Sequence, residues 1–408
     1  MNERFCYKGE CEVHLYNEGG TEMENVKTER LIWMDWLRVI AIFFVFVVHS
    51  CEPFFFGGEG TLIRCQSDAV WIAVLNTLVR SCVPLFVVAS SYLLFPVQTS
   101  TFTFFKCRAS RLLIPFALWT LIYAFLNGSF VENLSTLWQN FNYSAGHLWF
   151  VYMIVGVYLL MPLLSPWAER VSQRELLFYI ALCFVSALLP FLRCCLGEAA
   201  IVFGPGGLPN IAKYPLWGEA SWNTYGTFYY LSGYMGYLLL GCYLRRFVKA
   251  LSWTQTLKVA LPCGALGFVM SAGGFLWSIH ASAKTGFPVE GNIGLGATWE
   301  GFLLYDSIGV VLMTLAWLLC IRQIKSEGFV YQKLLLPCSR VSYGMYLGHM
   351  VLLVPLFGWI HPLMSAWLPT LWATPVTIIA TACATFVTSS LACLVLAKVP
   401  KVGKWIVG

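Results

Sequence analysis

The sequence predicts an all-α fold: a polytopic transmembrane helical bundle of about ten helices, with both termini cytoplasmic. Of the 408 residues, 58% are hydrophobic and only 11% are charged, whereas a soluble domain carries about a quarter charged residues. The charges cluster between long apolar runs, and ten of these runs approach the length a helix needs to cross a membrane, roughly 20 residues. Lysine and arginine are concentrated in alternate loops, as in multi-pass membrane proteins.

The apolar runs define the expected helices and the domain boundaries. In order they are 31–51, 70–95, 112–127, 148–167, 175–192, 226–244, 255–279, 301–321, 343–361 and 371–397. We expect a polar cytoplasmic tail at 1–30, a transmembrane domain at 31–397 and a short basic cytoplasmic tail at 398–408. Residues 1–30 lack the apolar core and cleavage site of a secretory signal, so the first helix is expected to be a retained anchor.

The basic residues indicate the orientation. With the N-terminus inside, 20 of the 26 lysines and arginines fall on the inner side and four on the outer side, with Arg38 and Arg80 inside the membrane. Because cytoplasmic loops are enriched in basic residues, this pattern predicts a multi-pass protein of the cell (inner or cytoplasmic) membrane. The net charge of +6 follows from the asymmetry. It indicates contact with anionic membrane lipids and gives no argument for nucleic acid.

The first expected helix carries two ionisable residues, Arg38 and His49, eleven residues apart. At 3.6 residues per turn and 1.5 Å per residue they lie on one face, roughly 16 Å apart. Ionisable groups at this depth are costly and usually functional. The alternative interpretation is an arginine that snorkels to the interface and a histidine satisfied by its neighbours.

The next stretch suggests a flap and a kink. The outer loop at 52–68 is rich in glycine and phenylalanine, and we expect a mobile or re-entrant flap over the end of His49. Cys51 and Cys65 fall on this side, where an oxidising compartment would allow a disulfide between them. Pro84 lies within the second apolar run and predicts a kink there.

Lys106, Arg108 and Arg111 precede the third expected helix at the inner membrane face. If this segment is helical, Arg108 and Arg111 share a face. A phosphate-bearing cytosolic ligand would find strong charge-assisted donors here. Positive charge that only sets the topology explains the same residues more simply.

Polar residues also gather at the outer side. His147 opens the fourth expected helix where His49 ends, and two histidines at one interface suggest proton transfer. A histidine anchored in an aromatic belt is the alternative. Trp217, in the long outer segment at 197–225, offers a flat face to a sugar ring, although such aromatics are common near lipid headgroups without any ligand.

Two further residues are candidates for polar networks. We expect Asp306 a little over one turn inside the eighth helix, at the outer side, as a partner for an arginine or a histidine. In the ninth helix Ser342, Tyr346 and His349 share a face. We assign Ser342 and Tyr346 to helix packing and His349, near mid-membrane, to a polar network.

Several motifs together resemble the integral-membrane acyltransferase family 3. The stretch DWLRVIAIFFVFVVHS has the Arg-(ten residues)-His signature of that family. Each motif alone is weak, but their order is specific, and the chain is most similar to stand-alone members that O-acetylate surface polysaccharides. One departure is Ser90-Ser91-Tyr92, where the family often has Ser-Gly-Tyr, which puts the local helix path in question. The motifs are DWLRVIAIFFVFVVHS at 35–50, VPLFVVASSYLL at 83–94, Arg108-x-x-Arg111 followed by Pro115, HLWFVYMIVGVYLLMPLL at 147–164, LSGYMGYLLLGCYL at 231–244 and SYGMYLGHM at 342–350.

The resemblance implies a membrane O-acyltransferase. It would move an acyl group, expected to be acetyl, from cytosolic acyl-CoA to a hydroxyl of an extracytoplasmic glycan or surface polysaccharide. The acyl-CoA would be a co-substrate, and no permanently bound cofactor is implied. His49 would be the catalytic base or a transient acyl carrier. From the resemblance and the residue patterns together, we expect catalytic roles for His49, Arg38 and His147; acyl-CoA-binding roles for Arg38, Lys106, Arg108 and Arg111; and substrate-binding roles for Asp35, Asp306, His349 and Trp217.

Other functions fit less well. A polysaccharide or lipid-linked glycan transporter or flippase would also use intramembrane arginine, histidine and aspartate, but such proteins often show related halves, and no internal repeat is visible. A structural or lipid-scaffold protein gives no reason for Arg38 and His49 to share a face. We expect no metal site, because no set of three close Cys or His ligands is visible.

Overall fold

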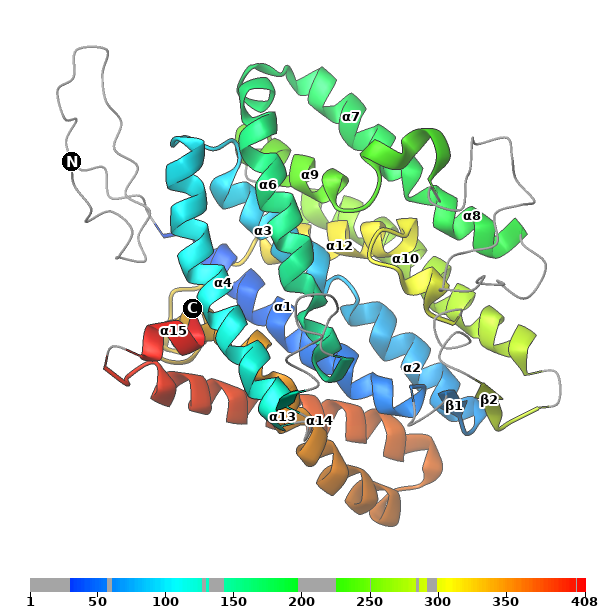
Figure 1. The fold of residues 1–408 in the computed structure, drawn as a ribbon. Helices are drawn as coiled ribbons and strands as arrows, with labels where there is room; N and C mark the ends of the chain where they lie inside the picture. Colours follow the sequence, from blue (N-terminus) through cyan, green and yellow to red (C-terminus); the bar gives the residue numbers. More distant parts are fainter. Residues whose placement is uncertain are drawn as a thin grey trace, which may run out of the picture.

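The computed structural model describes residues 30–56, 61–126, 130–131, 143–196, 225–249, 251–283, 286–291, 299–400 and 402–408. Within these residues the chain is a helical bundle with one small two-stranded sheet, as Figure 1 shows. Nine helical segments of the described residues are long and apolar enough to cross a membrane. The predicted all-α polytopic bundle is therefore confirmed.

Long α-helices joined by short turns make up most of the described chain. The α-helices are α1 Ile32–Cys51, α2 Gln66–Val79, α3 Cys82–Leu94, α4 Thr101–Leu126, α6 Trp149–Arg170, α7 Gln173–Ser186, α8 Leu188–Leu196, α9 Met235–Arg246, α10 Trp253–Ser282, α12 Ile308–Ile321, α13 Leu336–Trp367, α14 Thr370–Leu396 and α15 Gly403–Val407. The 3₁₀ helices are η2 Glu52–Phe54, η3 Tyr143–Leu148, η5 Gly226–Leu231 and η6 Glu300–Leu303, and η7 Tyr331–Leu335 is a short π-helix. The strands are β1 Thr61–Ile63 and β2 Val289–Gly291.

Helix α1 lies in the middle of the bundle (Figure 1) and packs against α2, α3, α13 and α14. Of its 20 residues, 13 are buried. An apolar helix can face lipid, but the Asp35, Arg38 and His49 side chains of α1 favour protein surroundings, because ionisable groups are costly in hydrocarbon. The position of α1 places both Arg38 and His49 among neighbouring helices.

The second apolar run is broken at Arg80 and Ser81, between α2 and α3. Pro84 explains the break, because it has no N–H to donate to the carbonyl of Arg80 four residues earlier and its ring crowds that carbonyl. The Cys82 thiol approaches the freed oxygen, with an S···O distance of 3.9 Å. The predicted kink is thus a full break, and it leaves the buried Arg80 side chain at the junction.

The outer loop after α1 is partly built into the fold. Strand β1 pairs antiparallel with β2, with Thr61 opposite Gly291 and Ile63 opposite Val289. The expected flap at 52–68 is therefore held at one end by strand pairing, while residues 57–60 lie outside the described part. Cys51 and Cys65 are both free thiols, so the disulfide that we considered is not formed.

Several expected helices differ in their bounds, among them 175–192, which is divided into α7 and α8, and 343–361, which is the longer α13. Helix α4 begins at Thr101, well before the expected 112–127, so the basic residues at 106–111 lie on a helix and not in a loop. The segment expected at 226–244 forms η5 and the 12-residue α9. Helix α12 begins only at Ile308. Apolar content does not distinguish one long helix from two short ones, so the sequence pattern could not show these boundaries.

The Ser90-Ser91-Tyr92 stretch does not disturb α3, which runs unbroken through it. The Ser91 hydroxyl donates a hydrogen bond to the carbonyl of Leu238 in α9. Gly241 makes the close approach instead, since a Cβ added there would lie 2.5 Å from that of Ser91. The small residue needed at the α3–α9 contact is thus on the partner helix.

Candidate active site

Three histidines converge at the predicted outer end of α1. The ring centroid of His349 lies 5.0 Å from that of His49 and 5.0 Å from that of His147, and the His49 and His147 centroids are 6.3 Å apart. They come from α13, α1 and η3. His349 is fully buried and His147 is 7% exposed, whereas the His49 side chain is 15% exposed. His49 is therefore the ring of the three that is most accessible to a substrate.

Glu52 orients His49. The Nδ1 atom of His49 lies 2.9 Å from Oε2 of Glu52, three residues further along. A carboxylate accepts the proton on Nδ1, and this assigns the lone pair to Nε2. A histidine held in this tautomer by a carboxylate is arranged as a general base, and the carboxylate stabilises the imidazolium that forms when the base takes a proton.

The other two rings donate to backbone carbonyls. Nδ1 of His349 lies 2.6 Å from the oxygen of Tyr346, and Nε2 of His147 lies 3.4 Å from the oxygen of Leu347. The Nε2 atom of His349 is buried and has no hydrogen-bond partner among the described residues. Because its Nδ1 is the donor, this free nitrogen is an acceptor that lacks a donor.

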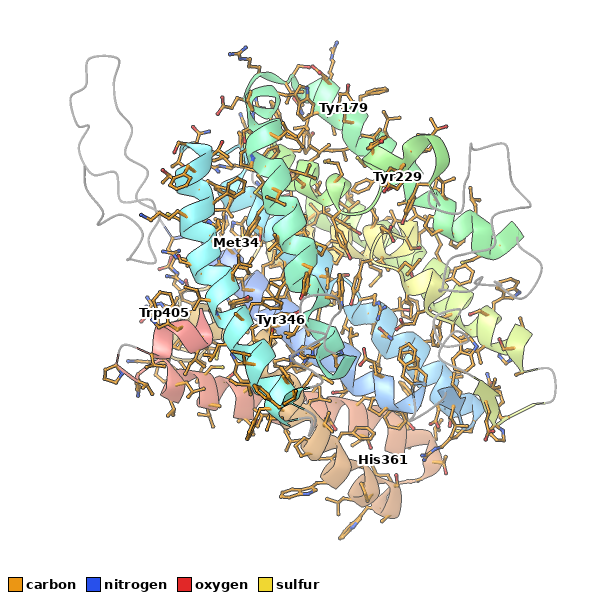
Figure 2. The ribbon with its side chains drawn as sticks, viewed as in Figure 1. Met34, Tyr179, Tyr229, Tyr346, His361 and Trp405 are labelled. Atoms are coloured by element: carbon orange, nitrogen blue, oxygen red, sulfur yellow. The ribbon has the colours of Figure 1, made fainter. Side chains whose placement is uncertain are left out.

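Tyrosine hydroxyls hold the backbone around these rings. Tyr346 donates to the carbonyl of His147 at 2.5 Å, and Tyr123 of α4 donates to that of Leu347 at 3.0 Å. In Figure 2 Tyr346 lies within the bundle, whereas His361, in the same helix α13, lies toward its far end. We assigned Tyr346 to helix packing, and its hydroxyl also positions the backbone of His147.

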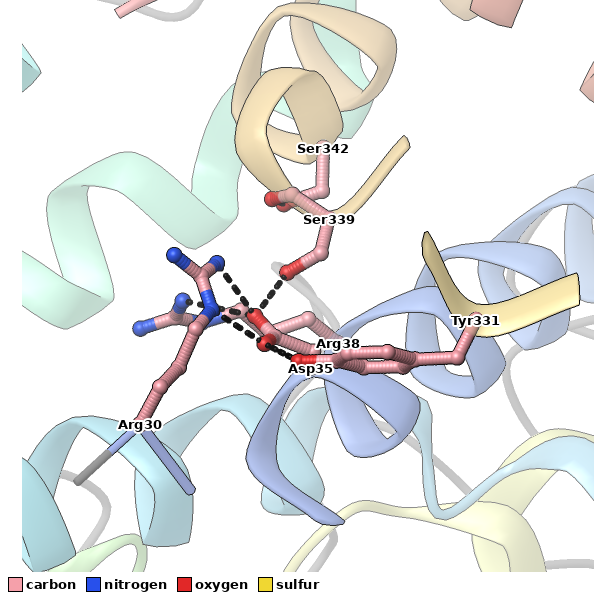
Figure 3. Close-up of polar contacts among 6 residues, drawn as sticks. All are labelled: Arg30, Asp35, Arg38, Tyr331, Ser339 and Ser342. Carbon is pink, nitrogen blue, oxygen red and sulfur yellow. Dashed lines mark hydrogen bonds and ion pairs between the residues drawn. The ribbon is translucent and has the colours of Figure 1, made fainter. Parts of the chain in front are cut away.

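A second polar network surrounds Asp35 at the predicted inner end of α1 (Figure 3). Asp35 is 2% exposed. Its carboxylate accepts hydrogen bonds from Arg30 Nε at 2.6 Å and Nη2 at 2.9 Å, from the Tyr331 hydroxyl at 2.8 Å and from the Ser339 hydroxyl at 2.6 Å. Its hydrogen bond to Arg30 raises the pKa of that guanidinium. Asp35 therefore ties α1 to η7 and α13; its predicted substrate-binding role stays a prediction.

Arg38 lies beside this network. Its Nη1 atom is 3.8 Å from Oδ1 of Asp35, and its side chain is 35% exposed. At this distance the two groups form an ion pair, but the atoms are too far apart for a hydrogen bond. Since four donors from other residues already occupy the two oxygens of Asp35, the guanidinium of Arg38 stays only loosely held by it.

The basic residues of α4 also lie near the inner end of α13. Lys106 and Arg111 are exposed, and Arg108 is half-buried with its guanidinium carbon 5.9 Å from the centre of the Phe104 ring. The Nε atom of Arg108 is buried and has no partner among the described residues. The Tyr343 hydroxyl of α13 donates to the carbonyl of Leu112 at 2.8 Å, which fixes this part of α4 against α13.

Asp306 is not inside a helix, and our predicted position for it was wrong. It lies in the short connection between η6 and α12, and the backbone N–H of Ile308 bonds to the carbonyl of Ala187 in the loop between α7 and α8. Its carboxylate accepts a hydrogen bond from the Tyr225 hydroxyl and not, as we expected, from an arginine or histidine. Trp217 lies outside the described residues.

Sequence reasoning missed two residues near His49, namely Glu52 and Glu300. Glu52 had a readable signal, because it follows His49 by three residues and so lies on the same helical face. Arg80 was recognised as an intramembrane charge, but its partner was not. Nη1 of Arg80 lies 3.2 Å from Oε1 of Glu300. The two residues are far apart in the chain, so no local pattern could pair them.

In the described ranges no group of three or more His, Cys, Asp or Glu residues could hold a metal ion.

The comparisons with known proteins agree with the motifs. A family model described as an acyltransferase domain matches residues 31–389, which include the three histidines and, of the Asp35 network, all members except Arg30. No curated protein and no solved structure matches the chain. The match covers most of the sequence, and the chain therefore belongs to acyltransferase family 3, as a multi-pass membrane acyltransferase.

Proposed function

We propose that the protein is an O-acyltransferase that moves an acyl group, expected to be acetyl, from cytosolic acyl-CoA to a hydroxyl of an extracytoplasmic glycan. The hydrogen bond between His49 and Glu52 carries the proposal within the acyltransferase family, because it leaves the most accessible histidine with a free Nε2. Membership of an acyltransferase family supplies the reaction class.

The chemistry follows from that lone pair. Nε2 of His49 takes the proton of the acceptor hydroxyl while the hydroxyl oxygen attacks the thioester carbonyl. The carbon–sulfur bond then breaks, and the departing thiolate receives the proton from His49, so that the products are an ester and free CoA thiol. Glu52 stabilises the imidazolium in between. The same nitrogen also serves the second route, in which His49 carries the acyl group transiently.

We assign donor binding to the basic groups at the inner end. Arg108 and Arg111, with Lys106, are suited to hold phosphates by charge-assisted hydrogen bonds. Arg38 would orient the donor closer to the reaction. The helical rise between Arg38 and His49, roughly 16 Å, is of the order of an extended pantetheine arm. The buried, unpartnered Nε of Arg108 supports a ligand on this face.

The alternative is a glycan transporter, in which polar side chains would line a continuous path. The arrangement favours the enzyme. Between Arg38 and His49, α1 carries only apolar residues. The ionisable groups described near the two ends of α1 instead form two separate sets, one around Asp35 and one around the three histidines.

Transfer of label from isotopically labelled acetyl-CoA to extracted glycan tests the proposal. We expect labelled glycan with the purified wild type and none with His49→Ala. His361→Ala is the matched control, because this histidine lies on α13 twelve residues beyond His349 and its ring packs on Phe357 and Phe54. Wild-type protein that transfers no label to any supplied glycan would contradict the proposal and favour transport.

A further inference from the structure

Three side chains that can accept hydrogen bonds are accessible at the outer end of α1. The exposed fractions of the side chains are 15% for His49 and 29% for Glu52, and 17% for Glu300. Glu300 interacts electrostatically with both of the others. Arg80, the cation that pairs with Glu300, is only 7% exposed.

Arg80 fixes Glu300 and is itself held by the protein. Its Nη1 atom contacts the Glu300 carboxylate at 3.2 Å and the Asn76 side-chain oxygen at 3.4 Å. Its Nε atom donates to the carbonyl of Leu303 at 2.7 Å, and its guanidinium lies 4.7 Å from the centre of the Tyr305 ring. These contacts commit Nε and Nη1 of Arg80 to the protein and hold Oε1 of the Glu300 carboxylate.

The group as a whole is short of donors. The proton on Nδ1 of His49 is taken by Glu52, so its Nε2 is an acceptor. Nε2 of His349, which is fully buried, is a second acceptor without a partner among the described residues. Two carboxylates add further acceptor sites. A ligand that suits these groups supplies O–H donors and carries no negative charge near them, because a phosphate or carboxylate would be repelled.

We propose that Glu300, positioned by Arg80, binds a second hydroxyl of the acceptor beside the hydroxyl that His49 deprotonates, and so selects neutral sugar rings over anionic ones. This inference rests on the proposed function, because it assigns the acceptor side of that same site. Glu300 is then an acceptor-binding residue, and Arg80 is a positioning residue.

The test compares Glu300→Gln with Glu290→Gln in the purified full-length protein. Glu290 is an exposed carboxylate on β2, at the same end of the molecule, and serves as the control. We expect Glu300→Gln to raise the KM for the acceptor about tenfold or more and to leave the KM for acetyl-CoA unchanged. Glu290→Gln should change neither. The double variant Arg80→Met with Glu300→Gln removes both charges of the ion pair and covers the case in which the single variant leaves Arg80 unpaired and does not fold.

Binding measured without transfer separates this inference from the proposed function. Saturation-transfer NMR would compare neutral trisaccharides, maltotriose among them, with trigalacturonate. We expect neutral binding in the wild type, loss of it in Glu300→Gln, and no binding of trigalacturonate. If neutral trisaccharides bind in this way but no acyl transfer occurs, the proposed sugar-binding role of Glu300 is supported and the acyltransferase proposal is contradicted. Transfer with an unchanged acceptor KM in Glu300→Gln, equal binding of trigalacturonate, or no binding of any neutral trisaccharide would overturn the role of Glu300.

Discussion

At the scale of single residues, the hydrogen bond between Glu52 and His49 decides what the site can do. A carboxylate on Nδ1 sets the tautomer, orients the ring and offsets the positive charge that appears when Nε2 takes a proton. The two deeper histidines donate hydrogen bonds to backbone carbonyls. The catalytic role of His147 and the substrate-binding role of His349 stay predictions.

Glu52→Gln tests this role. The amide keeps the size of the side chain but cannot offset the charge on the imidazolium, so we expect kcat to fall about 100-fold or more. The KM for acetyl-CoA should not change, because in our proposal the donor phosphates bind at the other end of α1. The control is Glu327→Gln, an exposed carboxylate near η7. A kcat equal to that of the wild type in Glu52→Gln would rule out a catalytic role for the hydrogen bond between Glu52 and His49.

Tyr346→Phe tests the support behind His147. Loss of the hydroxyl removes its hydrogen bond to the His147 carbonyl, and an unsatisfied buried polar group costs about 1–3 kcal/mol. We expect a lower thermal unfolding temperature in detergent and reduced activity. Tyr230→Phe is the comparison, since Tyr230 is 85% exposed. Equal unfolding temperatures for the two variants would show that this hydrogen bond contributes little.

At the scale of elements, α13 connects the two polar sets. Its inner end holds Ser339 against Asp35, and its middle carries His349. Close packing on α4 and α15 keeps it in place: a Cβ added at Gly344 would lie 2.8 Å from Val407, and one at Gly348 would overlap the Trp119 ring. Small residues of this kind let membrane helices approach closely.

Gly348→Ala tests this packing. The added methyl group must displace the Trp119 ring and with it α4, so we expect a lower unfolding temperature and loss of activity. Gly358→Ala, on the same helix, places its Cβ where no atom lies within 4 Å. That variant should be neutral or more stable by up to about 1 kcal/mol, because alanine favours the helix. Similar destabilisation by both would contradict a specific role for the contact between Gly348 and Trp119.

The apolar runs were sufficient to predict most helices, but not their breaks. Pro84 gave a readable signal for the junction at Arg80. No local pattern marked the connection that holds Asp306, because tertiary hydrogen bonds to Tyr225 and Ala187 help to form it. Likewise, spacing within single motifs identified Arg38, His49, His147 and His349, whereas the Arg80–Glu300 pair joins segments far apart in the sequence and needed the structure.

At the scale of the whole molecule, the bundle places Arg38 and the three histidines toward opposite ends of the buried helix α1. In the proposed function these ends are the donor side and the acceptor side. This separation suits a reaction in which the donor binds from one face of the membrane and the acceptor binds from the other. It also explains why both polar sets are built around α1: its rigid helix fixes the distance between them.

The most direct measurement of this claim uses sealed proteoliposomes with a defined protein orientation. Labelled acetyl-CoA is supplied only on the side of Arg38 and the α4 basic residues, and the glycan only on the side of His49. We predict labelled glycan in this arrangement, none when the two substrates exchange sides, and none with His49→Ala. Equal labelling in both arrangements, or transfer that survives the loss of His49, would contradict transfer across the membrane at this site.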